Sequence, residues 1–351
     1  MAQSSLTRRA FAGAAVTSAV IGPAAAQPKP LVRVAFGSCV DPRDPQPIWD
    51  AILAYKPDLF LFCGDNVYGD SKDRDLKELK AAYALARQSP GYTKLRESVR
   101  HLATWDDHDY GVNDAGGDMP FKAESKEEFL KFWDAPTADP RRLHEGIYYS
   151  ESFGTTGQRV QVILLDIRSF KSPWLPSENR GAPGMERYIP DSDPAKTMLG
   201  PAQWTWLAER LREPADLRLL VSSIQVLANG HGWERWGNFP RERRKLYELV
   251  RHARAENLLI LSGDRHLGAI YRETSGTPYP FTEITSSGLT KYFPNPKEPG
   301  PNRIGPVYGR PNFGTIDIDW WEKKVRLAVR DEAGQMVRSH SVPLEEMRFR
   351  T

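Results

Sequence analysis

The sequence contains little cysteine and no long hydrophobic run. Cys39 and Cys63 are the only cysteines among 351 residues, which excludes a scaffold held together mainly by disulfides. After a short stretch near the N-terminus that is rich in alanine and glycine, no segment approaches the roughly 20 apolar residues that a membrane-spanning helix needs. We therefore expect a globular fold with an apolar core and no stable membrane anchor.

An excess of charge of one sign is also lacking. Lysine and arginine number 48 and aspartate and glutamate 45, for a formal net charge of +3, and Arg8 and Arg9 contribute two of these charges. The most basic run, residues 241–245, includes Glu242 and is typical of the solvated face of a helix. Nucleic-acid-binding proteins normally carry a basic patch or stripe, so we expect no nucleic-acid partner.

The N-terminus has the features of an export signal. Two arginines at 8 and 9 precede a mild apolar run over 10–21, and three alanines at 24–26 supply a small-residue cleavage site. The pattern is similar to a twin-arginine (Tat) signal; a Sec signal and a disordered tail are the alternatives. We predict a signal over residues 1–26 that engages the Tat export machinery, a single domain over 27–351, and a periplasmic or secreted location.

Apolar strands alternate with amphipathic helices as far as residue 261, which is typical of an α/β sheet buried on both faces. After Gly263 several strands follow one another through short or looped connections, which predicts a closing antiparallel, meander-like sheet. Two mixed sheets packed together with helices outside accommodate the whole pattern. The predicted strands are 31–37, 58–63, 101–105, 160–165, 217–224, 258–261, 269–273, 281–285, 315–320, 325–330 and 336–342, and the predicted helices are 48–55, 75–87, 126–133, 203–211 and 243–254.

Four polar segments each follow an apolar strand. They are 36–39 (Phe-Gly-Ser-Cys), 64–68 (Gly-Asp-Asn-Val-Tyr), 105–109 (Trp-Asp-Asp-His-Asp) and 263–266 (Gly-Asp-Arg-His). Because the carboxyl ends of strands form the binding crevice of open α/β sheets, we expect these segments to converge. Carboxylates suit hard cations, whereas thiolate, phenolate and imidazole suit iron or zinc. Taken singly, each segment has an ordinary structural explanation, such as a turn or a small buried Cys39, but their joint occurrence favours a metal site.

The segments at 64–68, 106–109 and 263–266 resemble the ordered motifs of the metallophosphoesterase superfamily. Residues 36–39 and the Asp-Asp-His-Asp form narrow the resemblance to the PhoD-like alkaline phosphatases, and it covers most of residues 31–342. The resemblance implies a four-layer αββα sandwich of two mixed sheets flanked by helices, and a centre of Fe³⁺ with Ca²⁺. The sequence differs from the family pattern in one respect. We expect no N-terminal β domain before the first strand of its catalytic domain.

The resemblance also implies roles for individual residues. Asp65 corresponds to the bridging carboxylate, Cys39 and Tyr68 to iron ligands, and Asp264 and His266 to ligands on the last motif loop. The reaction it implies is in-line attack on phosphorus by a metal-bound hydroxide.

Three further residues belong to the segment from 107 to 113. Asp107 occupies the place of the usual metal-binding asparagine. Asn113, five residues after His108, matches an asparagine of the family and is expected to offer an oxygen to calcium. His108 resembles the residue that contacts phosphate and assists the leaving group, and we predict that it is catalytic.

Arg168 and His231 are candidate substrate-binding residues. Arg168 follows the strand at 160–165 and either binds phosphate bidentately or pairs with an acid as scaffold. His231 lies between two glycines, in a stretch where other superfamily members place a metal-binding histidine; the alternative is an exposed loop residue. Cys39 likewise has a second interpretation, because a disulfide to Cys63 would remove its thiolate from a metal.

The sequence favours an enzyme that hydrolyses phosphate esters in the manner of an alkaline phosphatase. A phosphodiesterase or phospholipase-type hydrolase uses the same centre and is the nearest alternative. A non-catalytic exported protein that binds metal or phosphate is less favoured, because such a protein has no need of an acid such as His108 beside the centre. An iron oxidoreductase is also less favoured, because carboxylates suit hydrolysis better.

Overall fold

The computed structural model describes residue 1, residues 29–296 and residues 298–350. The predicted signal, apart from its first residue, lies outside these ranges. In the part of the chain that the structure describes, no helix is long and apolar enough to cross a membrane.

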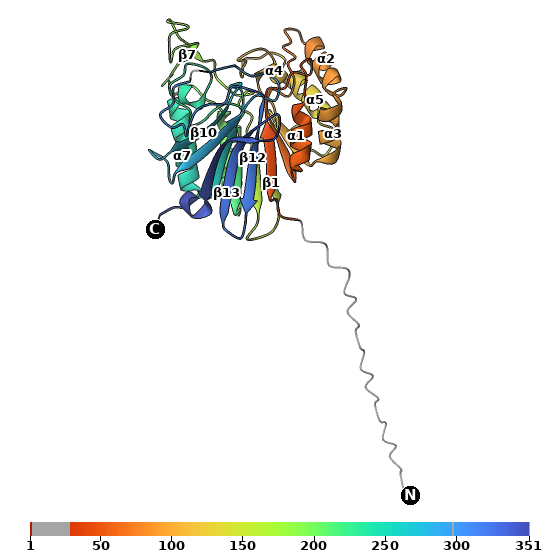
Figure 1. The fold of residues 1–351 in the computed structure, drawn as a ribbon, viewed down its shortest axis with the longest axis vertical. Coiled ribbons are helices and arrows are strands. Elements are labelled where there is room, and N and C mark those ends of the chain that lie inside the picture. The colour runs from red at the N-terminus through yellow and green to blue at the C-terminus, as the bar shows by residue number, and fades with distance from the viewer. Residues whose placement is uncertain (2–28, 297, 351) are drawn as a thin grey trace.

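Two six-stranded mixed sheets lie face to face at the centre of the molecule (Figure 1). Strands β1, β2 and β3 are parallel in the first sheet, and β5, β8, β9 and β11 are parallel in the second. In spatial order the first sheet contains β14 (Met336–Pro343), β13 (Lys324–Asp331), β12 (Asn312–Asp319), β1 (Arg33–Gly37), β2 (Leu59–Cys63) and β3 (His101–Thr104). The second contains β10 (Gly268–Glu273), β11 (Phe281–Ser286), β9 (Leu258–Ser262), β8 (Leu217–Val221), β5 (Val160–Leu164) and β4 (Tyr149–Phe153).

Helices cover the outer face of each sheet (Figure 1). The first sheet is covered by α1 (Ile48–Tyr55), α2 (Lys77–Ala86), α3 (Pro90–Ser98) and α5 (Lys122–Phe132), whose apolar faces share one buried cluster with it. The second is covered by α6 (Gly200–Arg212) and α7 (Pro240–His252). Short elements complete the chain: α4 (Asp107–Tyr110), the hairpin of β6 (Leu175–Pro176) and β7 (Tyr188–Ile189), and the 3₁₀ turns η1 (Pro140–Leu143), η2 (Trp236–Asn238) and η3 (Leu344–Met347).

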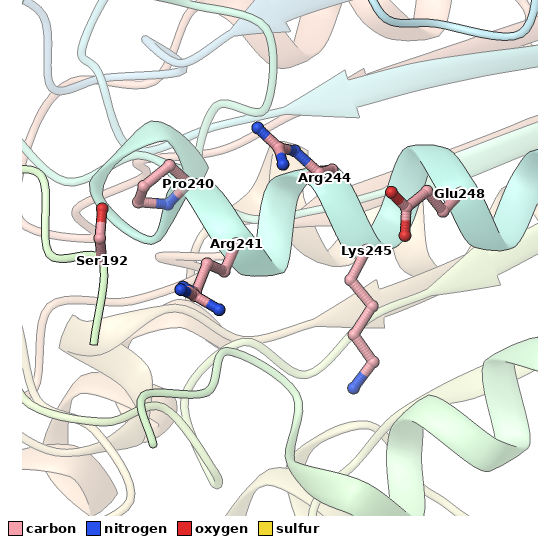
Figure 2. A pocket seen from close by; sticks show the side chains of 6 residues that line it. All are labelled: Ser192, Pro240, Arg241, Arg244, Lys245 and Glu248. Carbon is pink, nitrogen blue, oxygen red and sulfur yellow. The ribbon is translucent and has the colours of Figure 1, made fainter. Parts of the chain in front are cut away.

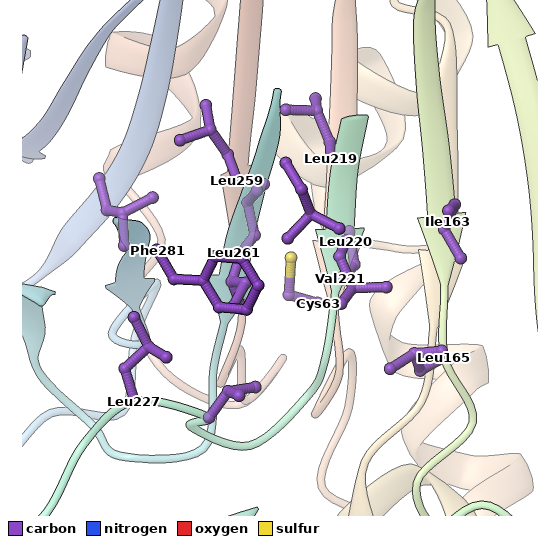
Figure 3. Close-up of a cluster of buried hydrophobic side chains, with 14 of the residues drawn as sticks. Cys63, Ile163, Leu165, Leu219, Leu220, Val221, Leu227, Leu259, Leu261 and Phe281 are labelled. Carbon is purple, nitrogen blue, oxygen red and sulfur yellow. The ribbon is translucent and has the colours of Figure 1, made fainter. Parts of the chain in front are cut away.

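Strand β2 is apolar throughout because both of its faces are buried. Successive side chains of a strand point to opposite faces of the sheet, and both faces are buried here. Phe60 and Phe62 face the helices, where each ring lies within 6.3 Å of the ring of Trp49. Cys63 faces the second sheet, among side chains of β8 and β9 (Figure 3), and Leu61 belongs to the same buried cluster. Two sheets buried on both faces form the expected four-layer αββα sandwich.

The C-terminal strands depart from the predicted single meander. Strands β12 to β14 extend the first sheet, where β12 pairs antiparallel with β1, whereas β10 and β11 extend the second sheet. The chain between Ser286 and Asn312 therefore crosses from one sheet to the other. The prediction of one closing sheet was wrong because short strands of similar composition do not reveal which sheet edge each one joins.

Candidate metal centre

Two glycines let the motif loops approach one another closely. Gly64 follows β2 with φ +101°, and a Cβ at this position would lie 2.6 Å from the Cβ of Asp106. Gly263 follows β9, and its Cβ would lie 3.0 Å from the carbonyl oxygen of Cys63. Any larger side chain would push these loops apart, so glycine at both strand ends allows the two sheets to present their loops to one space.

The candidate ligands beside these glycines have unusual backbone conformations. Cys39, Asp65, Asp264 and His266 have φ angles of 61°, 46°, 65° and 54°, in the left-handed region that residues other than glycine rarely adopt. Such conformations cost of order 1–3 kcal/mol each and persist only where the surroundings impose them. The clustering of four such residues at one place is typical of a functional site.

Cys39, Asp65 and His266 form the first group that could hold a metal, with ligand atoms within 4.8 Å of one another. Tyr68 completes the group: its hydroxyl lies 3.2 Å from Oδ2 of Asp65 and 2.9 Å from Nε2 of His266. The Cys39 Sγ lies 3.4 Å from the same carboxylate oxygen. A thiol, a phenol, an imidazole and a carboxylate are therefore gathered around one small volume, a donor set that suits ferric iron.

Carboxylates dominate the adjacent groups. Asp65, Asp107 and His108 form one group, and Asp106, Asp107 and Asp264 form another, so Asp65 and Asp107 are each shared between neighbouring groups. Oδ2 of Asp106 is buried and has no hydrogen-bond partner among the described residues. A buried carboxylate oxygen without a donor is costly, and its position in this group fits a hard cation such as calcium or magnesium.

The electrostatics of the side chains fit a bound cation. Burial and then Asp107 raise the pKa of Asp65 well above its usual value, and burial and then Asp65 raise the pKa of the Cys39 thiol. Burial also raises the pKa of Asp264. Without added positive charge, ionisation of one of these groups opposes ionisation of the others. A bound metal ion would stabilise each anion and so reverse this effect.

His108 lies at the partly open side of the centre. Its Nδ1 lies 2.8 Å from Oδ2 of Asp70, and its ring packs on Tyr68 with a centroid distance of 4.3 Å. Burial opposes its charged form, but Asp65 and Asp107, together with Asp70, outweigh burial and raise the pKa of His108 to about 11. The imidazole therefore holds a proton beside the carboxylates.

Comparison with known proteins identifies a family for this chain. The sequence profile described as PhoD-like phosphatase matches residues 35–304. The chain belongs to the PhoD-like phosphatase family. Among curated proteins no significant match was found. Among solved structures, the chain is similar to one titled "Structure of PhoD", with 17% sequence identity, a TM-score of 0.66 and coverage of 92% of this chain and 70% of that one.

Two other solved structures share the fold. A purple acid phosphatase from yellow lupin seeds has 12% identity and a TM-score of 0.61, with coverage of 91% of this chain and 55% of that one. GAP50, described as the anchor in the inner membrane complex of Plasmodium, has 11% identity and a TM-score of 0.56, with coverage of 92% and 90%. At these identities the likeness shows the metallophosphatase fold alone.

The segment that follows His108 contributes a further acidic residue. Asn113, the residue expected to offer an oxygen to calcium, is exposed. The adjacent Asp114 belongs to a group with Asp107 and Glu234, and its backbone amide donates to Oδ2 of Asp107 at 2.6 Å. Sequence reasoning missed Asp114 and Glu234. Only the spacing from the Asp-Asp-His motif pointed toward Asp114, and Glu234 lies in a loop without a recognisable motif.

Arg168 is completely buried, and each of its nitrogens donates to a protein acceptor. Nε donates to Asp106 Oδ1 at 2.6 Å, and Nη1 and Nη2 donate to the two oxygens of Glu234 at 2.9 and 2.8 Å. Nη1 also donates to the carbonyl of Ala115 at 3.2 Å. With four hydrogen bonds to these buried acceptors, Arg168 matches the scaffold interpretation rather than phosphate binding.

His231 is buried away from the ligand groups. Its Nε2 lies 3.0 Å from Oε1 of Gln225, and its Nδ1 accepts from the backbone amide of Trp233 at 3.2 Å. Burial, followed by Arg265, lowers its pKa well below the usual value. A neutral ring that donates through Nε2 and accepts through Nδ1 satisfies both contacts, so His231 holds its loop in place.

Cys39 and Cys63 are both free and buried. The disulfide considered for this pair is absent from the described structure, and the thiol of Cys39 remains beside Asp65.

A surface groove of about 410 Å³ lies along α7, outside the ligand groups (Figure 2). It is lined by Ser192, Pro240, Arg241, Arg244, Lys245 and Glu248. Its basic residues lie on the solvent side of the helix, as the sequence predicted, and none of them belongs to the metal centre.

Proposed function

We propose that this protein hydrolyses phosphate esters with the help of metal ions bound at the centre. The observation that carries the proposal is the sharing of Asp65 and Asp107 between neighbouring ligand groups directly beside His108. Two cations that share a carboxylate clamp the oxygens of a phosphate during in-line displacement. Membership of the PhoD-like phosphatase family supports the same reaction class.

We further propose that different metals bind on the two sides of Asp65. Cys39, Tyr68 and His266 together with Asp65 would hold Fe³⁺, because thiolate, phenolate and imidazole suit iron. Asp107, Asp106 and Asp264, again with Asp65, would hold Ca²⁺, as carboxylates do. When bound, such ions supply Lewis acidity toward the phosphate oxygens and activate water for attack.

His108 supplies the acid for the leaving group. Hydrolysis forms a bond between a water oxygen and phosphorus and breaks the bond between phosphorus and the ester oxygen, which must then gain a proton. His108, oriented by Asp70, lies at the open side of the centre and would donate this proton.

Removal and replacement of metal tests the proposal. We expect chelation to abolish hydrolysis of a phosphate monoester, and Fe³⁺ with Ca²⁺ to restore it more fully than either ion alone. The same preparation assayed with a diester decides between a phosphomonoesterase and a phosphodiesterase or phospholipase-type enzyme. Metal binding with no hydrolysis of either ester would instead support the non-catalytic metal- or phosphate-binding protein.

We also propose that the protein is exported and acts as one domain over 27–351. The twin arginines and the alanine cleavage site support export. N-terminal sequencing of protein recovered from the periplasm or medium should begin after Ala26, and an intact N-terminus in the cytoplasm would contradict this.

A further inference from the structure

We propose that Phe293, with Tyr292 beside it, recognises the alcohol part of the ester, and that the preferred substrates carry a flat aromatic alcohol. The inference rests on the proposed function and concerns the identity of the substrate.

Part of the centre is open to solvent. Cys39 and the carboxylates of Asp65 and Asp107 are buried, whereas Tyr68, His108, Asp264 and His266 are partly exposed. The rings of Tyr68, His108 and His266 therefore border a route to the candidate ligands. An exposed side chain next to these rings lies where it can contact the substrate.

Phe293 borders this open side. Its ring lies 4.7 Å from the ring of His266, centroid to centroid, and its backbone amide donates to the His266 carbonyl at 2.8 Å. Phe293 is nevertheless 45% exposed, and the neighbouring Tyr292 is 41% exposed. Large apolar side chains exposed together next to a catalytic centre are typical of a binding surface.

The backbone that carries these rings is anchored to two motif loops. The amides of Thr290 and Lys291 both donate to the carbonyl of Cys39, at 3.1 and 3.0 Å. The amide of Phe293 donates a hydrogen bond to the carbonyl of His266. The segment is thus tied to two of the loops that carry candidate metal ligands. This anchoring keeps the aromatic segment beside His266, where its rings offer flat apolar surface to a flat partner.

The charges nearby favour an uncharged partner. Lys291 is the cation on this segment, and its Nζ lies 3.1 Å from Asp41 and 3.0 Å from Asp44. Asp41 also pairs with Arg43, so two cations and two carboxylates balance one another here and leave no net charge for a second phosphate in the alcohol part. An aromatic group that packs on Phe293 instead covers exposed apolar surface and gains ring–ring contact.

The test compares an aryl and an alkyl phosphate, naphthyl phosphate and glycerol phosphate, by release of inorganic phosphate. In Phe293→Ala we expect kcat/KM for the aryl ester to fall by roughly three- to tenfold and that for the alkyl ester to stay nearly unchanged. Phe293→Leu keeps apolar packing on His266 and should also lower the aryl to alkyl ratio, whereas Phe293→Tyr should preserve it. The control is Trp321→Ala, since this residue is 90% exposed in the turn between β12 and β13.

Equal losses on both esters, or an unchanged ratio in both Phe293→Ala and Phe293→Leu, would overturn the inference. Metal content measured in each variant separates recognition from damage to His266, because a variant that has lost metal should lose both activities together. Failure of the unaltered protein to hydrolyse either ester would contradict the proposed function instead.

Discussion

The Nδ1 atom of His108 lies 2.8 Å from Oδ2 of Asp70, which is itself partly exposed. This contact fixes the ring at the open side of the metal centre. The other ring nitrogen, Nε2, has no hydrogen-bond partner among the described residues. The pair thus has the arrangement expected of an acid and its orienting carboxylate.

His108→Ala should lower kcat by roughly 10²- to 10⁴-fold, the usual contribution of a general acid, with metal content nearly intact. Asp70→Asn should lower kcat by about tenfold, because the carboxylate acts through the ring rather than on the substrate. Steady-state kinetics and metal analysis on the same samples check both. Loss of metal from His108→Ala would make the histidine a structural ligand.

Tyr68→Phe should change the colour of the iron-loaded protein. Burial and then Cys39 hold the pKa of Tyr68 well above its usual value, so its ionisation requires a bound cation. A phenolate on Fe³⁺ gives a visible charge-transfer band, and we expect the variant to lose it. Tyr83→Phe is the control, because Tyr83 lies in the apolar cluster beneath the helices and its buried hydroxyl lacks a partner among the described residues. An identical spectrum in both variants would exclude Tyr68 as a ligand.

Arg168→Met should destabilise the metal-free protein by about 3–5 kcal/mol, because it leaves the buried carboxylates of Asp106 and Glu234 without their partner. The control is Arg326→Met, which removes a half-exposed contact to Asp317 worth at most about 1 kcal/mol. Urea unfolding of both variants measures the difference. Similar losses in the two would show that the buried contacts of Arg168 contribute no more than a surface pair.

Glu283→Gln should flatten the dependence of stability on pH. Burial raises the pKa of Glu283 from 4.5 to about 7, although the amides of Val226 and Leu227 donate to its carboxyl. The folded state therefore keeps a proton that the unfolded state loses above pH 4.5, so this group's contribution falls as pH rises from 4.5 to 7, by roughly 3 kcal/mol. Urea unfolding at pH 5 and 7.5 measures this change. Equal changes in the variant and the unaltered protein would contradict the assignment.

Much of the fold follows from the sequence because its strands are buried on both faces and its main helices are amphipathic. Helix α1 begins and ends where predicted, at Ile48 and Tyr55. Helix α3 was missed because it begins with Pro90 and Gly91, a pair typical of turns, although proline suits a first helical turn. Strand β4 was missed because it is a half-exposed edge strand whose residues, Tyr-Ser-Glu-Ser-Phe, lack an apolar run.

The site was predictable where local motifs carry it. The loops with Cys39, Asp65, Asp107 and Asp264 were expected to converge, and the structure places their side chains in adjoining groups. Glu234 joins them only through tertiary packing against Arg168, which leaves no local pattern in the sequence.

Elemental analysis of the purified mature protein, with phosphate-ester hydrolysis measured on the same sample, tests the central claim most directly. We predict bound iron and calcium, and hydrolysis of a chromogenic monoester or diester. Asp65→Asn, which alters the carboxylate shared by two ligand groups, should lose both metal and activity. Protein without bound metal, whose activity is not restored by adding iron and calcium, would contradict the account.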